Sequence, residues 1–371
     1  MEIIGIIAEY NPFHNGHLHH IKTIKEKYKD SLIILVLNGY FLERGEVSFI
    51  NKKDKTKIAL NYGIDVVVEL PFIYGSQSAD IFAYNSIKIL NNLGVTKIIF
   101  GSESNNIDLL DKIANIQLND QEYQNKIKKY LDEGLNYPTA LSKALNIEEE
   151  FNNPNDLLGI SYIKAIKQIN SNIIPETIKR TNSYHDKESN DNIVSATNIR
   201  EKLKNNENIE KYIPNLVGKH IIIPNPYFNY LKYKILTTHD LNKYLTVDEG
   251  IENRLLKAIK QANNLEELIE LVKTKRYTYN KINRMFIHIL IGLTKEDNIN
   301  AKLDYIKVLG FNNLGRQYLN QIKKDAIIPI TINRESLIYK YELTAASIYD
   351  LITNQNNYEF EINNKPIQKA D

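Results

Sequence analysis

Two histidines near the amino terminus have the spacing and the surroundings of a phosphate-binding site. Residues 5–17 read Gly-Ile-Ile-Ala-Glu-Tyr-Asn-Pro-Phe-His-Asn-Gly-His, so that His14 and His17 form a His-x-Gly-His pattern. Gly16 leaves room for a phosphate to approach the backbone. An imidazole there can donate a hydrogen bond to the charge that builds up when a bond to pyrophosphate breaks. The pattern therefore favours contact with the α-phosphate of a nucleotide.

A strand, a turn and a helix must position this pattern. Ile3 to Ile7 is a nearly continuous β-branched run, which is typical of a parallel strand covered on both faces. Asn11 and Pro12 then turn the chain. Apolar residues recur at helical spacing from Leu18 to Tyr28, which predicts a helix that begins around the second histidine. Free backbone N–H groups and the helix dipole at that end favour an anion.

The alternative is that both histidines are ordinary surface or core residues. A single histidine would favour that interpretation. Here strand, turn, His-x-Gly-His and helix follow one another in the order that phosphate binding needs, and this order favours the functional interpretation.

Three further segments carry candidate ligand contacts. Asn155 follows Pro154 in a segment predicted to be helical as far as Ile169, where its expected role is to cap the helix. Arg180 ends a predicted strand over residues 176–180. It therefore falls at the carboxyl end of that strand.

Residues 195–200, Ser-Ala-Thr-Asn-Ile-Arg, open another predicted helix. Ser195 or Thr197 is placed to cap it, and Arg200 follows about one turn later. Such turns can grip phosphates through hydroxyl, backbone N–H and guanidinium groups, although capped helices with an early arginine are common. Because the same chain also has His-x-Gly-His, the phosphate-binding interpretation of this turn is favoured.

The elements around these residues predict an α/β domain with a parallel sheet. Further strands are predicted at residues 32–37, 66–70 and 97–100, with helices at 52–62 and 79–93 between them. Ligands bind beyond the carboxyl ends of parallel strands. The His-x-Gly-His turn, residues 38–45 and residues 101–104 should therefore line one cleft.

After about Pro226 the chain becomes mainly helical, which predicts two domains, residues 1–225 and residues 226–371. A polar tail is expected after about Asn354. The predicted helices of the second domain are 231–245, 249–261, 265–273, 279–293, 301–308 and 314–323.

Basic residues cluster with tyrosines in this second domain. Such clusters suit RNA, because the cations neutralise phosphates and the rings stack on unpaired bases. The alternative is a solvated basic helix face. The cluster comprises Lys273, Lys275, Arg276, Lys281 and Arg284 with Tyr277 and Tyr279.

Composition narrows the chemistry further. The chain of 371 residues has no Cys, which excludes disulfides, thiolate nucleophiles and Cys-based zinc sites. Its net charge of +2 favours no partner by itself. There is no apolar run of membrane-spanning length and no signal-peptide pattern. A soluble cytoplasmic protein is expected.

The His-x-Gly-His motif together with the Ser/Thr-x-x-Arg turn resembles the nucleotidylyltransferase superfamily, which is itself similar to the class I aminoacyl-tRNA synthetase core. Landmarks along residues 5–316 resemble more narrowly the bacterial tRNA(Met) cytidine acetate ligases. The resemblance implies a Rossmann-like nucleotidylyltransferase domain followed by a mainly helical domain. The landmarks are Glu9–His17, Glu69–Phe72, Gln77–Asp80, Phe100–Glu103, Pro154–Gly159, Ile178–Arg180, Tyr184–Asp186, Ser195–Arg200, Glu249–Arg254 and Thr274–Thr278.

The resemblance implies a two-step reaction. Acetate attacks the α-phosphate of ATP and gives acetyl-adenylate and pyrophosphate. The N4 amine of the wobble cytidine in elongator tRNA(Met) then takes the acetyl group, leaving N4-acetylcytidine and AMP. Adenylation supplies the leaving group, so the absence of a Cys nucleophile is no obstacle.

The resemblance also implies roles for particular residues. His14 and His17 would be the catalytic residues, while Ser195 and Arg200 are candidates for phosphate contact. Mg²⁺ is expected with the ATP phosphates, without a dedicated protein ligand set. The implied ATP-binding residues are Ile7, Ala8, Glu9, Tyr10, Asn11, Pro12, Phe13, His14, Asn15, Gly16, His17, Leu18, His19, His20, Gly101, Asn155 and Arg180, and the tRNA-binding candidates are Arg254, Lys275 and Arg276.

The loop after the second strand departs from the family pattern. Glu43 stands where Gln is expected, and Asn51-Lys52-Lys53 stands where Asp-Lys-Trp is more usual. Contacts of this loop with acetate or tRNA are therefore left open.

Two other functions also remain open. A nucleotidylyltransferase that joins a nucleoside monophosphate to a phosphorylated small molecule would share the first motif without needing a basic helical domain. The second alternative is an RNA-binding protein with a degenerate nucleotide site. The presence of both histidines and of Arg180 argues against it.

Overall fold

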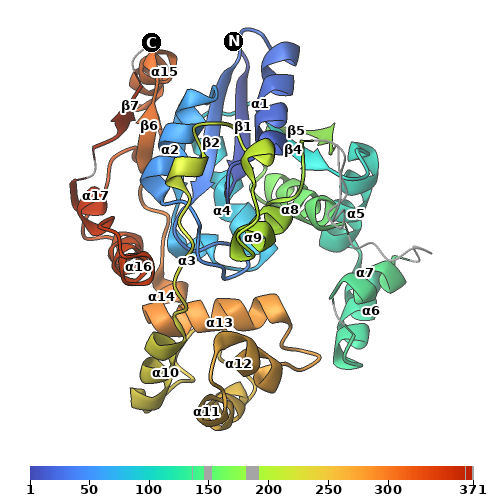
Figure 1. Cartoon of the computed structure of the whole chain (residues 1–371). Helices are drawn as coiled ribbons and strands as arrows, with labels where there is room; N and C mark the ends of the chain where they lie inside the picture. The colour runs from blue at the N-terminus through green and yellow to red at the C-terminus, as the bar shows by residue number, and fades with distance from the viewer. Residues whose placement is uncertain (136, 146–152, 181–191, 364, 370–371) are drawn as a thin grey trace.

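A seven-stranded sheet forms the centre of the molecule, with the order β5-β4-β1-β2-β3-β6-β7 (Figure 1). The computed structural model describes residues 1–135, 137–145, 153–180, 192–363 and 365–369. Paired neighbours run parallel except β3 and β6, which are antiparallel. The predicted α/β class is confirmed. The strands are β1 (Ile3–Ala8), β2 (Leu32–Asn38), β3 (Val66–Leu70), β4 (Lys97–Ser102), β5 (Ile174–Lys179), β6 (Val308–Phe311) and β7 (Ile367–Gln368).

The two faces of the sheet are packed into separate hydrophobic cores. In β2, Ile34 and Val36 belong to one core, whereas Ile33 and Leu35 belong to the other. Helices α4, α5 and α8 contribute to the first core, and α1, α2 and α9 to the second. Because successive side chains point to opposite faces, only an unbroken apolar run can serve both cores. These helices are α1 (Asn15–Lys27), α2 (Lys52–Asn61), α4 (Ala79–Asn92), α5 (Ile107–Asn119), α8 (Pro154–Gln168) and α9 (Ala196–Lys204).

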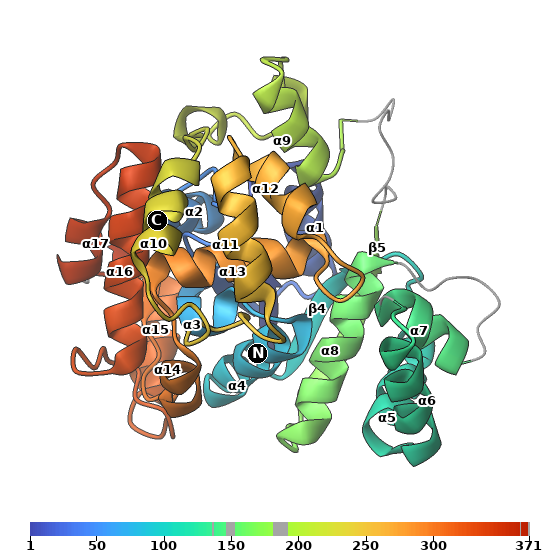
Figure 2. The same cartoon turned by 90° about the horizontal axis from the view of Figure 1, so that it is seen from below.

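Two smaller groups of helices flank this core. Helices α5 to α7 form an arm beside α8 (Figure 2). A helical lobe, α10 to α14, lies below the carboxyl ends of the strands, with α13 next to the α/β part (Figure 1). The remaining helices are α3 (Phe72–Gly75), α6 (Gln121–Asp132), α7 (Tyr137–Ala144), α10 (Phe228–Thr237), α11 (Ile251–Gln261), α12 (Leu265–Val272), α13 (Tyr279–Ile291), α14 (Lys295–Asn300), α15 (Asn313–Ile322), α16 (Leu337–Thr353) and α17 (Tyr358–Asn363), with 3₁₀ turns at Glu210–Tyr212 and Gly218–His220.

Three predictions for the carboxyl-terminal part differ from the structure, and helices α14 and α16 were not predicted. The predicted helix 231–245 ends at Thr237. The predicted helix 301–308 is wrong, because residues 301–307 have no regular structure and β6 begins at Val308. The expected polar tail contains α17 and β7, and β7 pairs with β6. Residues 226–371 thus supply two strands to the sheet, and the domain division at residue 225 stays a prediction.

None of the helices in the described ranges combines the length and the apolar character that crossing a membrane demands.

Candidate active site

A cleft of about 300 Å³ opens at the carboxyl ends of β1, β4 and β5. Fifteen of the residues proposed from the sequence line it. Four neighbours, Pro12, Phe13, Asn15 and Leu18, do not. The lining set comprises Ile7, Ala8, Glu9, Tyr10, Asn11, His14, Gly16, His17, His19, His20, Gly101, Asn155, Arg180, Ser195 and Arg200.

The two motif histidines cap the first helix reciprocally. The Gly16 N–H donates to His14 Nδ1 at 3.0 Å, and the His14 N–H donates to His17 Nδ1 at 3.2 Å. The two rings lie 3.8 Å apart, centre to centre. Because each Nδ1 accepts a hydrogen bond, the proton of each neutral ring resides on Nε2. The motif therefore sets the tautomer of both imidazoles.

Burial and nearby cations keep these imidazoles uncharged. Burial, followed by the guanidiniums of Arg180 and Arg200, lowers the pKa of His14 to about 3. Burial, His14 and Arg180 lower the pKa of His17 well below its usual value. Near neutral pH both rings are neutral Nε2–H donors, which can bind a phosphate oxygen without exchanging a proton with it.

A third imidazole follows on the same helix. Within the described part of the chain, His20 Nε2 is buried without a hydrogen-bond partner. Burial and Arg180 lower the pKa of His20 to about 4. His20 lines the cleft, and its spacing of three residues from His17 is the signal that marks it in the sequence.

Phe13 supports the cleft from behind. Its ring is fully buried and lies 5.6 Å from the ring of His17 and 5.2 Å from that of Tyr62, centre to centre. Tyr10, which does line the cleft, lies 4.8 Å from both His17 and Phe13, centre to centre. The two aromatic rings restrict the orientation of the imidazole.

Asn155 has a different local role from the predicted one. Helix α8 begins at Pro154, so the cap position belongs to Asn153, whose side chain makes no capping bond. Glu103 acts in its place, because its carboxylate accepts from the Asp156 N–H at 3.1 Å and from Asn155 Nδ2 at 2.5 Å. The capping group, Glu103, lies in a loop about 50 residues earlier in the sequence. The local pattern could not reveal it and pointed to the nearby Asn155 instead.

Gly101 and Arg180 lie side by side at the ends of β4 and β5. A Cβ atom at Gly101 would lie 3.3 Å from Arg180 Cγ. Arg180 Nε is 3.9 Å from Glu103 Oε1. The missing side chain at Gly101 thus leaves room for the arginine on the cleft wall. The predicted polar segment after Arg180, which includes Tyr184–Asp186, lies outside the described residues.

The Ser195 cap is confirmed, since its hydroxyl accepts from the Asn198 N–H at 3.2 Å. Arg200 is held by protein groups. Its guanidinium donates to Asn11 O at 2.9 Å and lies 2.9 Å from Glu46 Oε2. Arg200 therefore ties α9 to the first turn and to the loop after β2, and its contact with phosphate stays a prediction.

The loop after β2 supplies three cleft residues, Glu43 and Arg44 from the segment 38–45 that was expected there and Glu46 just beyond it. Burial raises the pKa of Glu43 to about 7, although the Arg284 guanidinium opposes this shift. Arg284 Nη1 lies 3.1 Å from Glu43 Oε1. The position of residues 38–45 after a strand predicted their place at the cleft. It did not reveal that Arg284, on α13, is the ion-pair partner of Glu43.

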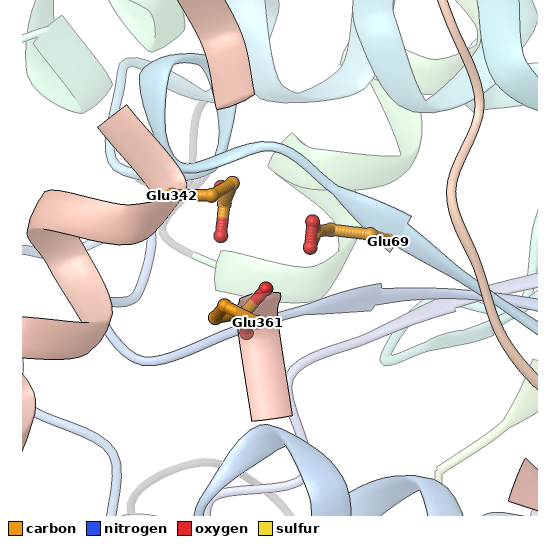
Figure 3. A group of neighbouring side chains, drawn as sticks. All are labelled: Glu69, Glu342 and Glu361. Carbon is orange, nitrogen blue, oxygen red and sulfur yellow. The ribbon is translucent and has the colours of Figure 1, made fainter. Parts of the chain in front are cut away.

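The acidic cluster found in the described residues lies away from this cleft. Ligand atoms of Glu69, Glu342 and Glu361 lie within 4.8 Å of one another (Figure 3). Lys52 Nζ occupies their centre, at 2.7, 2.7 and 2.8 Å from the three carboxylates. An ammonium group thus takes the place that a metal ion would need, and the cluster is a buried ion-pair network.

The tRNA-binding candidates lie on a separate groove of the helical lobe. Arg254 has a structural role, since it donates to Leu271 O at 2.8 Å and to Lys273 O at 3.2 Å. Arg276 lies 3.3 Å from Glu249, and both side chains are about half exposed. Lys275 is exposed. The two exposed cations are better placed to meet a phosphate than Arg254.

Comparisons with known proteins agree with this architecture. A family model described as HIGH Nucleotidyl Transferase matches residues 1–364. A tRNA(Met) cytidine acetate ligase of Fusobacterium nucleatum is 41% identical and covers 87% of this chain and 85% of the relative. One of Clostridium novyi is 36% identical and covers 99% of both. The crystal structure of Thermotoga maritima TmcAL bound with alpha-thio ATP is 28% identical and covers both chains fully, with a TM-score of 0.86.

Proposed function

The chain belongs to the HIGH nucleotidyl transferase family and, within it, to the tRNA(Met) cytidine acetate ligases, and on that premise we propose that it activates acetate with ATP and transfers the acetyl group to tRNA. The acceptor is N4 of the wobble cytidine of elongator tRNA(Met), and the product is N4-acetylcytidine. A reaction that consumes ATP and tRNA belongs in the cytoplasm, which is the location that we propose.

The pair of neutral imidazoles in the cleft carries this proposal. Both rings carry their proton on Nε2, which can donate to a ligand in the cleft, because the Nδ1 atoms accept from the backbone. A carboxylate oxygen of acetate attacks the α-phosphorus, and the bond to the pyrophosphate oxygen breaks. Negative charge grows on the phosphate oxygens, where fixed Nε2–H donors stabilise it.

The second step needs no nucleophile from the protein. The N4 lone pair attacks the acetyl carbonyl carbon, the bond from that carbon to the AMP oxygen breaks, and N4 gives up one proton to solvent. Arg180 lies on the cleft wall and offers a cation for the phosphate of the departing AMP. We propose ATP contacts for the residues implied by the family pattern that line the cleft.

Magnesium would accompany ATP. The carboxylates that line the cleft are Glu9, Glu43 and Glu46, and each already has a protein partner. They do not form a dedicated ligand set, so the ATP phosphates would supply most ligands. When bound, the ion supplies positive charge to the leaving pyrophosphate.

The test is incubation with ATP, Mg²⁺, labelled acetate and bulk tRNA, followed by analysis of the tRNA nucleosides. We expect label in N4-acetylcytidine of elongator tRNA(Met) and acetate-dependent exchange of pyrophosphate into ATP. Exchange that ignores acetate and needs a phosphorylated metabolite would instead identify a nucleotidylyltransferase. Binding of tRNA without any exchange would identify a non-catalytic RNA-binding protein.

His17→Ala should lower acetate-dependent exchange by about 10²- to 10³-fold, the usual loss when one donor to a developing charge is removed. His239→Ala is the matched control, because that histidine is exposed and lies outside the cleft. Unchanged exchange in His17→Ala would contradict the catalytic role of the pair.

A further inference from the structure

A short hairpin, residues 41–47, carries charged side chains into the cleft from the side of the helical lobe. Phe41 and Val47 form an antiparallel bridge, and the Leu42 N–H donates to Glu46 O at 3.0 Å. Glu43 and Arg44 at its tip line the cleft. The hairpin therefore meets the nucleotide site and the lobe at once.

Both sides of the hairpin are anchored. The Glu43 N–H donates to Glu9 Oε1 at 2.7 Å, which joins it to the turn that bears the histidines. On the other side, a Cβ at Gly45 would lie 2.4 Å from Arg284 N, so the hairpin backbone rests directly on α13. The position of its tip is thus fixed relative to the turn that bears the histidines and to α13.

The Glu43 carboxylate lies between two guanidiniums. Oε1 is 3.1 Å from Arg284 Nη1, whereas Oε2 is 3.9 Å from Arg44 Nε, beyond hydrogen-bonding distance. The side chains of Glu43 and Arg44 are 21% and 32% exposed. Arg284 therefore holds one carboxylate oxygen, whereas the other makes no contact of hydrogen-bond length with Arg44 Nε, and both Glu43 and Arg44 line the cleft.

This arrangement is complementary to the edge of one pyrimidine. Cytosine presents the N4–H donor next to the acceptors N3 and O2, whereas uracil presents the acceptor O4 at the position of N4. Enzymes that act on a base commonly read its Watson–Crick edge in the active site. A carboxylate would accept from N4–H and would repel O4.

We propose that Glu43 and Arg44 bind the Watson–Crick edge of the acceptor cytosine, with Glu43 Oε2 accepting from N4–H and the Arg44 guanidinium donating to N3 or O2. Glu43 is then a positioning residue for N4, and Arg284 positions Glu43. This inference rests on the proposed function and adds the residues that select cytosine.

The test separates the two half-reactions. In Glu43→Ala we expect kcat/KM for transfer to tRNA to fall by about 10- to 100-fold, as when a specific contact to a base is lost. Acetate-dependent pyrophosphate exchange, measured without tRNA, should change by less than about threefold. Glu43→Gln keeps an oxygen acceptor and should lose less than about fivefold in transfer.

A competition assay addresses base selection directly. Elongator tRNA(Met) with cytidine or with uridine at the wobble position competes against labelled substrate. We expect the preference for cytidine to shrink at least about fivefold in Glu43→Ala, which removes the acceptor. It should shrink less in Glu43→Gln, which keeps an acceptor oxygen but loses the charge that repels O4.

The outcomes distinguish this inference from the proposed function. Wild-type protein that forms no N4-acetylcytidine refutes the proposed function. With active wild-type protein, the inference is refuted by an unchanged preference for cytidine in Glu43→Ala, by an equal loss of exchange and transfer, or by Glu43→Gln being as impaired as Glu43→Ala.

Discussion

At the scale of single residues, the site uses histidine in its uncharged form. Desolvation disfavours imidazolium, and Arg180 and Arg200 add positive charge nearby. A protonated His14 would lose the Gly16 N–H bond that its Nδ1 accepts. The same interactions that orient the ring thus make the folded state sensitive to acid.

His14→Asn should reduce this sensitivity. The pKa of His14 falls from 6.5 to about 3 on folding, so its contribution to stability is present above pH 6.5 and is lost as the pH falls below that value. Protonation of the unfolded chain at pH 5 favours unfolding by about 2 kcal/mol. Urea unfolding should show a drop between pH 7 and pH 5 that is about 2 kcal/mol smaller in the variant, where Asn retains the capping function. An equal drop in both proteins would contradict the assignment.

At the scale of elements, the cleft depends on how the hairpin 41–47 sits on α13. Gly45 has a φ of 74°, which is a left-handed conformation, and its backbone contacts that of Asn283 and Arg284. Both features require glycine at this position. The helical lobe is therefore joined to the wall of the cleft through main-chain contact.

Gly45→Ala should disrupt this contact, and Gly250→Ala is a matched control. Gly250 also has a left-handed φ, of 79°, but a Cβ there would meet only Asn253 Nδ2 at 3.9 Å. The control isolates backbone strain, which costs about 1–2 kcal/mol. Gly45→Ala adds the collision with α13, so its loss in unfolding free energy should exceed that of the control by at least about 1–2 kcal/mol. Equal losses in urea unfolding would show that α13 accommodates the methyl group.

At the scale of the whole molecule, the Lys52 network joins distant parts of the chain. Its three carboxylates come from β3, α16 and α17, and Lys52 lies on α2. Burial and Glu69 raise the pKa of Glu342 to about 7, while Lys52 and Lys307 outweigh burial and lower the pKa of Glu361 to about 2. The network binds the last helices to the sheet.

Lys52→Met should destabilise the protein by about 3–5 kcal/mol, since it leaves buried carboxylates without their central cation. Lys53→Met is the control, because Lys53 is exposed on the same helix. Urea unfolding of both variants measures the difference. A loss below about 1 kcal/mol in Lys52→Met would show that the glutamates protonate at little cost.

The exposed cations of the lobe should contribute to tRNA binding through counterion release. In Lys275→Ala/Arg276→Ala, tRNA affinity should fall, and the slope of log K against log[salt] should decrease by about 1–2. Acetate-dependent exchange without tRNA should be retained. Lys323→Ala/Lys324→Ala removes two exposed lysines at the end of α15 and should leave the slope unchanged. Equal slopes in all three proteins would place the tRNA elsewhere.

Local sequence patterns determined several secondary-structure elements and helix caps of this protein. The apolar run Ile3–Ile7 and the helical periodicity after it predicted a strand, a turn and a helix, and the structure has all three. Ser195, one of the two capping candidates that the sequence offered, caps α9. These features depend on residues within a few positions of one another, where propensity and hydrogen bonding act without help from the rest of the fold.

Only the tertiary structure decided which distant groups meet. Glu103 caps α8, Arg284 holds Glu43, and Glu361, from a segment expected to be a polar tail, is fully buried against Lys52. The charge of a side chain does not reveal its partner, because a buried ion pair joins residues far apart in sequence. The sequence thus determined the His-x-Gly-His turn and the family, and long-range packing determined the electrostatic environment that keeps His14 and His17 neutral.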